Sequence, residues 1–78
     1  MIFQNQKWRF LMKLELDIDT IEKILKKEDR NRAWLGRKIM ASNASMSYIW
    51  SVKPISQAER IALALGVMPK TLIKQIQE

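Results

Sequence analysis

The ionisable side chains of this 78-residue chain limit the chemistry that it can carry out. The sequence has no His and no Cys, residues that often act as general base, nucleophile or zinc ligand. Its acidic residues form no recognisable catalytic pair: Glu15, Asp17, Asp19, Glu22, Glu28, Asp29, Glu59 and Glu78. We therefore expect a protein that is not an enzyme and that holds no metal and no cofactor.

The positive charges are concentrated in one part of the chain. The net charge is +6, and the interval 30–58 contains no acidic residue but holds the cations Arg30, Arg32, Arg37, Lys38 and Lys53. The remaining 9 of the 14 basic residues nearly balance the 8 acidic ones. Such a segment attracts a polyanion. The alternative is a solvated basic surface that has no partner.

Length and composition predict one small folded domain. A chain of 78 residues has no room for a second core, and 47% hydrophobic residues with two Gly and two Pro suit a helical domain. The longest nearly apolar stretch, residues 61–69, is far shorter than the roughly 20 residues that cross a bilayer, and no signal-peptide pattern is present. We expect a cytoplasmic protein without membrane contact.

The N-terminal part of the chain has the pattern of a strand. Between Lys7 and Ile18 the odd positions are charged, except Leu11, and the even positions are all apolar: Trp8, Phe10, Met12, Leu14, Leu16 and Ile18. A period of two predicts a strand that buries one face.

Helix signals follow this strand. Asp19 and Glu22 have the spacing of a capping box, which predicts a helix start. Asn31 is the expected N-cap of a second helix, and Ser42 that of a third helix over about residues 43–52, which Pro54 stops. The residues expected to face inward from these helices are Ile21, Ile24, Leu25, Leu35, Ile39, Met46 and Ile49.

Two further helices are predicted before the C-terminus. Ser56 and Glu59 form the clearest capping box, and Gly66 is the expected C-cap of that fourth helix. Pro69 suits the first position of a fifth helix. Their expected inward residues are Ala58, Ile61, Ala62, Leu65, Leu72, Ile73 and Ile76.

Residues 32–51 resemble the helix-turn-helix of the Cro and phage-repressor family. Gly36 occupies the slot where the two helices approach closely, and the buried slots hold Leu35, Ile39, Ala41, Met46 and Ile49. The tail AERIALALGVMPKTLI is similar to the later helices of that family. The resemblance implies a mainly α, compact five-helix lambda-repressor-like DNA-binding domain over residues 19–78, preceded by an arm or dimerisation strand in residues 1–18.

One residue departs from the family pattern. Met40 stands in the turn where the family usually has a left-handed Gly, and a non-Gly residue in that conformation costs on the order of 1 kcal/mol. We expect a strained or differently shaped turn.

The resemblance also implies which residues contact DNA. The helix over residues 43–52 enters the major groove, and its expected base contacts are Asn43, Ala44, Ser47 and Tyr48. For Tyr48 there are two alternatives, contact with a base or contact with a phosphate. The expected phosphate contacts are Arg32, Arg37, Lys38, Ser42 and Lys53.

The backbone N–H and C=O groups of the predicted strand need a partner strand, and no other strand is predicted in this chain. We therefore expect the strand to pair with the same strand of a second copy. Pairing two copies gives a homodimer through a β-ribbon, with expected dimerisation residues Trp8, Phe10, Met12, Leu14 and Leu16. The alternative is that residues 1–11 form an unpaired arm. Trp34 and Trp50 either pack on their own domain or meet the strand or a second subunit.

Resemblance to the family implies a transcriptional repressor that binds an inverted-repeat operator in double-stranded DNA, of phage or antitoxin-like type. The competing interpretation is a protein-interaction adaptor that keeps the fold and uses the surface of Trp34, Trp50 and the N-terminal strand to bind another protein. The basic interval favours DNA over this adaptor. RNA is disfavoured, because a helix does not fit the narrow major groove of A-form RNA.

Overall fold

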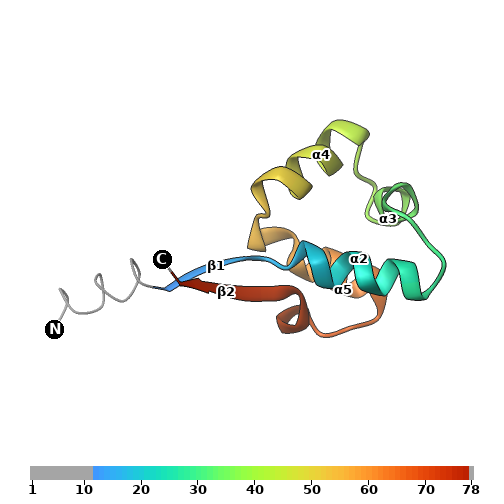
Figure 1. The fold of residues 1–78 in the computed structure, drawn as a ribbon. Coiled ribbons are helices and arrows are strands. Elements are labelled where there is room, and N and C mark those ends of the chain that lie inside the picture. Colours follow the sequence, from blue (N-terminus) through green and yellow to red (C-terminus); the bar gives the residue numbers. More distant parts are fainter. Residues whose placement is uncertain (1–11, 78) are drawn as a thin grey trace, which may run out of the picture.

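The computed structural model describes residues 12–77, which form four α-helices and a two-stranded sheet (Figure 1). In chain order the elements are β1 (Met12–Leu16), α2 (Ile18–Lys27), α3 (Arg32–Lys38), α4 (Asn43–Val52), the 3-10 turn η1 (Ile55–Gln57), α5 (Ala58–Leu65), the 3-10 turn η2 (Pro69–Leu72) and β2 (Ile73–Gln77). The helices pack into one body, and the strands project from it as a ribbon. No helix within residues 12–77 is long and apolar enough to cross a membrane.

The core draws on every helix and on β1. Its fully buried large side chains are Leu16, Ile21, Leu35, Ile61 and Leu72. The predicted inward positions are confirmed for Leu25, Ile39, Met46, Ile49, Ala58, Ala62 and Leu65 as well, whereas Ile24 is only half-buried. No charged or polar side chain in the described residues is buried. The buried core that packs the helices together is therefore entirely apolar.

The first helix begins earlier than predicted. Its N-cap is Asp17, which accepts hydrogen bonds from the Thr20 amide at 3.1 Å and the Thr20 hydroxyl at 2.7 Å. Asp19 lies exposed in the first turn, so the predicted capping box with Glu22 is wrong. The reason is that Ile18 is buried as the first helical residue, which moves the cap back to Asp17.

The predicted caps of the next two helices are confirmed. The Asn31 side chain accepts from the Trp34 amide at 2.9 Å, and Ser42 Oγ accepts from the Ser45 amide at 3.1 Å. Met40, in the turn between these helices, has a φ of 58° and is therefore left-handed. The Ala41 amide donates to the Gly36 carbonyl at 2.8 Å, which completes a normal helix-ending turn despite the missing Gly.

The start of α5 differs from the prediction, although its end does not. Ser56 lies in the turn η1, and α5 follows Gln57, which makes no side-chain capping hydrogen bond. The predicted capping box of Ser56 with Glu59 is therefore wrong, because the 3-10 turn that follows Pro54 leads directly into the helix. Gly66 ends α5 with a φ of 73°, as predicted.

The C-terminus does not form the predicted fifth helix. Pro69 begins only the turn η2, and β2 then pairs antiparallel with β1, with Glu15 opposite Lys74 and Leu16 opposite Ile73. The prediction that the N-terminal strand lacks a partner in its own chain is therefore wrong. Pairing the two strands satisfies backbone groups that either would leave unpaired alone. Leu72 is buried as expected.

Candidate nucleic-acid interface

One face of α4 is open to solvent and contains the base contacts predicted from the sequence. Met46 and Ile49 anchor the helix in the core. The predicted base contacts lie on the opposite side and are all exposed: Asn43, Ala44, Ser47 and Tyr48. Their separations of three and four residues place them on one stripe. In Figure 1 this helix lies along the outer side of the helical body, with its C-terminal end toward β1.

Ser51 continues this stripe and was not among the sequence-predicted contacts. It is exposed and lies one turn beyond Ser47, at i+4. The same spacing in the sequence is the signal that could have found it. The exposed residues of this face, the recognition stripe, are therefore Asn43, Ala44, Ser47, Tyr48 and Ser51.

Gly36 sets how closely α3 approaches α4. A Cβ atom at this position would lie 3.2 Å from Met46 Cγ, closer than a comfortable contact. In Figure 1 α3 is seen almost end-on while α4 runs across the view, so the two helices cross steeply. This crossing forms a cleft whose lining includes Arg32, Arg37, Asn43 and Ser47. Two predicted phosphate contacts and two predicted base contacts thus lie together.

Arg32 rests on an aromatic platform. Its guanidinium lies 4.9 Å from the centre of the Trp50 ring. The Trp50 indole Nε1–H donates a hydrogen bond of 2.8 Å to Glu22 Oε2. Trp50 of α4 therefore contacts both Arg32 of α3 and Glu22 of α2, and so links the three helices at the surface.

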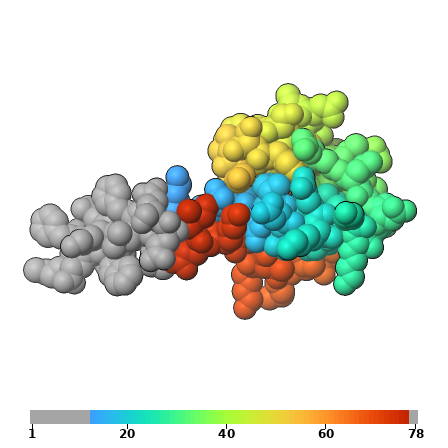
Figure 2. Space-filling model, viewed as in Figure 1, coloured from blue at the N-terminus to red at the C-terminus, as the bar shows by residue number. Residues whose placement is uncertain are grey.

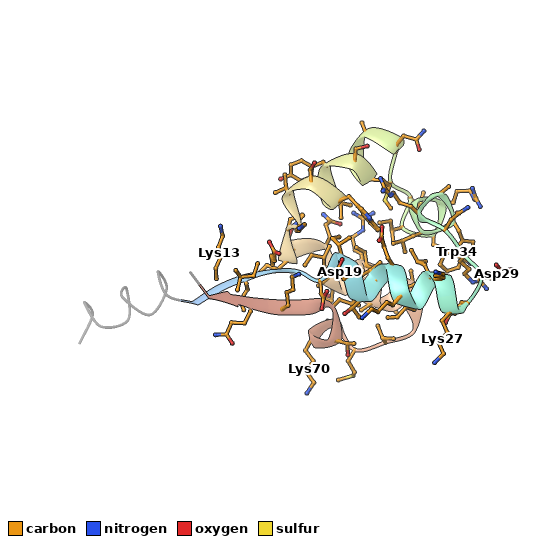
Figure 3. All side chains as sticks on the ribbon, in the orientation of Figure 1. Lys13, Asp19, Lys27, Asp29, Trp34 and Lys70 are labelled. Atoms are coloured by element: carbon orange, nitrogen blue, oxygen red, sulfur yellow. The ribbon has the colours of Figure 1, made fainter. Side chains whose placement is uncertain are left out.

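Trp34 binds cations on the other side of α3. Arg30 lies 4.1 Å and Lys38 5.7 Å from the centre of its ring. Figure 3 shows Trp34 near Asp29, at the end of the body where α2 gives way to α3. Lys38 lines the cleft between α3 and α5 and not the one beside Asn43. The structure therefore does not bring this predicted phosphate contact to the recognition stripe.

Both tryptophans that were candidates for an outside contact pack on their own domain. Trp34 and Trp50 are half-buried and lie against the hydrophobic core. Each has a cation over its ring. They therefore serve first to join helices of the same chain.

Lys53 lies at the far end of α4 from Asn43. Its backbone is left-handed with a φ of 57°, and its carbonyl accepts from the Leu16 amide at 2.9 Å. Its ammonium group lies 4.0 Å from Glu15 Oε1. The ten residues of α4 span about 15 Å, so Lys53 is separated from the stripe's N-terminal half. Part of its charge is compensated by Glu15.

The arginines beside the stripe keep their charge available. Within residues 12–77 the ion pairs involve Arg30, Lys53 and Lys74, and none involves Arg32, Arg37 or Arg60. Figure 2 shows α4 and α3 side by side on the upper side of the body, with the β-ribbon leaving the body at the end opposite to α3. The uncompensated positive charge is thus next to the recognition stripe.

Of the five predicted dimerisation residues, the structure describes the side chains of Leu14 and Leu16, and these two differ in exposure. Trp8 and Phe10 lie outside the described residues. Leu14 is 51% exposed in β1, but Leu16 is fully buried in the core of its own chain and is not open to a second copy. Leu16 is therefore wrong as a dimer contact. Met12 is the first residue of β1.

The described residues contain no cluster of three or more acidic side chains that could hold a metal ion. Comparison with protein-family models, with curated proteins and with solved structures finds no match to this chain.

Proposed function

We propose that this chain is a sequence-specific double-stranded DNA-binding protein that inserts α4 into the major groove. The observation that carries the proposal is that the recognition stripe is exposed and lies beside Arg32 and Arg37. An α-helix with its side chains is about 10–12 Å wide and the major groove is about 12 Å wide, so α4 fits between the strands. Its exposed N-terminus adds backbone amides that attract phosphate.

Each residue of the stripe suits a particular contact. The Asn43 amide matches the two hydrogen-bonding atoms of adenine, Ala44 matches the thymine methyl group, and Ser47 pairs with either kind of base. Arg32 and Arg37 then hold phosphates beside the helix, with Ser42 at its N-terminus. Phosphate contacts set the position, and the stripe supplies the specificity.

The biological role that follows is transcriptional repression, and it rests on the resemblance to the Cro and phage-repressor family. A homodimer would read an inverted repeat with half-sites about 34 Å apart. Because β1 already pairs with β2, the second copy would have to meet the ribbon at an outer edge or at Leu14. A dimer of this kind differs from the one predicted from the sequence, in which the N-terminal strands of two copies pair with each other.

A second candidate function is supported by exposed apolar side chains on another side. Met40 is 90% and Leu63 is 86% exposed, and both line the cleft between α3 and α5. A protein partner could cover this apolar surface. An adaptor of this kind would not need the uncompensated arginines beside α4, which is why we favour DNA.

The test is selection of bound sequences from a random double-stranded DNA pool at two salt concentrations. We expect an enriched inverted repeat whose binding weakens steeply with salt. Asn43→Ala and Ser47→Ala should relax specificity at individual base pairs by about 1–3 kcal/mol each. Recovery of no preferred sequence, with weak binding lost at moderate salt, would favour the adaptor.

Two control variants are matched to these substitutions. Thr71→Ala removes an exposed hydroxyl, as Ser47→Ala does, but from η2. Lys70→Gln removes one positive charge, as Arg37→Gln does, and Figure 3 shows Lys70 pointing away from the side of α3 and α4. Neither control should change the selected sequence. If Lys70→Gln weakened binding as much as Arg37→Gln, only net charge would matter.

A further inference from the structure

A second cleft lies on the other flank of α4. It has a volume of about 350 Å³ and is lined by Met40, Ala41, Ala44, Ser45, Tyr48, Ile49, Gln57 and Arg60. The recognition stripe therefore stands between two clefts, one with Arg32 and Arg37 and one with Arg60. No sequence pattern assigned a role to Arg60.

The Arg60 guanidinium is held in place from two sides. One nitrogen, Nη2, donates to the Ile39 carbonyl at the C-terminal end of α3, and Nη1 donates to Gln57 Oε1 at 3.2 Å. A guanidinium has five N–H donors, so these two bonds leave three. Arg60 forms no ion pair within residues 12–77. It is a fixed cation with donors still to satisfy.

We propose that Arg60 binds a backbone phosphate of the DNA strand opposite to the one that Arg32 and Arg37 contact. This inference rests on the proposed function. A helix seated in the major groove has the phosphates of one strand on each flank, because the groove is about as wide as the helix. A cation fixed in the second cleft faces the second row of phosphates. The planar guanidinium suits two phosphate oxygens at once.

The other polar groups of this cleft support an anion as the occupant. Gln57 already accepts one bond from Arg60, and its amide nitrogen remains a donor. Tyr48 lines the same cleft and is 57% exposed, so its hydroxyl can donate to the same phosphate. No carboxylate lines the cleft. Tyr48 is thereby assigned to the phosphate flank of the recognition stripe and not to a base.

The first test is the salt dependence of binding to a duplex recovered by selection, for Arg60→Gln, Arg60→Lys and the matched Lys70→Gln. Arg60→Gln should weaken binding about tenfold and lower the slope of log affinity against log salt by about 1. Arg60→Lys should keep the slope, because it keeps the charge. Lys70→Gln should leave both unchanged. Thermal unfolding checks that Arg60→Gln, which loses the bond to Ile39, is folded.

The second test needs no unstable variant. Single phosphates of the duplex are replaced by neutral methylphosphonates on each strand in turn, and affinity is measured for wild type, Arg60→Lys and Arg37→Gln. For wild type we expect that neutralising a contacted phosphate lowers the affinity, and that such phosphates are found on both strands. Arg37→Gln should lose the penalty in affinity on one strand. Arg60→Lys should reduce the penalty on the other strand without abolishing it, because lysine keeps the charge but loses the planar guanidinium that Gln57 and Ile39 hold in place.

The outcomes separate this inference from the proposed function. Sequence-specific binding with penalties on one strand only, or a folded Arg60→Gln with the wild-type salt slope, overturns the role of Arg60 and leaves DNA binding intact. If selection recovers no sequence and the wild type does not bind duplex DNA, both proposals fail.

Discussion

The indole N–H of Trp50 donates a 2.8 Å hydrogen bond to the carboxylate of Glu22, which joins α4 to α2. The same ring carries the Arg32 guanidinium 4.9 Å from its centre. One residue therefore both fixes α4 on the body and supports a cation beside the recognition stripe. These two tasks can be separated by substitution.

Trp50→Phe should affect stability more than DNA binding. Phenylalanine keeps a ring under Arg32 but loses the N–H, and we expect a loss of about 1 kcal/mol in the free energy of unfolding. Trp50→Leu should in addition lose the cation–π contact, worth about 0.5–1 kcal/mol at an exposed site, and weaken DNA binding. Urea unfolding and binding titrations measure the two effects. Equal DNA affinity of the two variants would show that the ring does not position Arg32.

Met40→Gly should stabilise the protein. Met40 is left-handed with a φ of 58°, and its side chain is 90% exposed, so glycine relieves the backbone strain without losing packing. The greater freedom of glycine in the unfolded chain offsets part of the gain, so we expect an increase of up to about 1 kcal/mol. Met40→Ala is the control, because it removes the side chain but keeps the strain. A gain for alanine equal to that for glycine would contradict the explanation.

Gly36 should tolerate only a very small side chain. A Cβ would lie 3.2 Å from Met46 Cγ, so Gly36→Ala requires a slight shift of Met46, while alanine gains about 1 kcal/mol of helix propensity. We expect a net change near zero. Gly36→Val should push α3 from α4 and cost about 1–3 kcal/mol, with weaker DNA binding. A valine variant as stable as wild type in urea would mean that the close approach is not required.

The charge of Asp17 should make part of the stability depend on pH. Burial acts to raise the pKa of Asp17, but the hydrogen bonds from Thr20 and the charges of Lys74 and Lys23 outweigh it, so the pKa is lowered. The folded state thus prefers the ionised carboxylate. Its contribution is complete above the ordinary aspartate pKa and is lost as the pH falls through the lower folded-state value.

Asp17→Ala tests this dependence. The variant should be about 1 kcal/mol less stable than wild type near neutral pH, because it loses the N-cap of α2. The difference should shrink as the pH is lowered into the acid range, where wild type loses the same charge. Asp19→Ala is the control, since Asp19 is exposed and caps nothing. A difference that stays constant down to acid pH would rule out the charge as the cause.

The sequence predicted the parts of the fold that depend on local signals. The caps Asn31 and Ser42 and the bounds of α4 follow from short-range spacing, and so do most of the buried positions. The exposure of the predicted base contacts follows from the same helical period. Whether they contact DNA stays a prediction.

The errors occur where distant residues decide the structure. Ile73 and Ile76 have helical spacing, but pairing with β1 makes their segment a strand. Likewise, the contact of Arg60 with the Ile39 carbonyl joins α5 to α3 across 21 residues, which no local pattern indicates. The shift of the first cap to Asp17 has the same origin, because Ile18 is drawn into the core. Local propensity yields to tertiary packing at these sites.

The ribbon should depend on one carboxylate. Glu15 Oε1 lies 3.8 Å from Lys74 Nζ, its cross-strand partner, and 4.0 Å from Lys53 Nζ at the end of α4. Glu15→Gln removes both attractions, and we expect a loss of about 0.5–1 kcal/mol that becomes smaller in high salt. Lys74→Gln, which removes only the cross-strand pair, should cost less.

Hydrogen exchange of the β1 and β2 amides would locate the effect. If exchange in Glu15→Gln became faster only in the two strands, the carboxylate would stabilise only the pairing of β1 with β2. Faster exchange that includes the C-terminal turn of α4 would show that it also holds Lys53 against β1, as the 2.9 Å bond from the Leu16 amide to the Lys53 carbonyl leads us to expect. Unchanged exchange in all of these elements would mean that backbone pairing alone holds the ribbon.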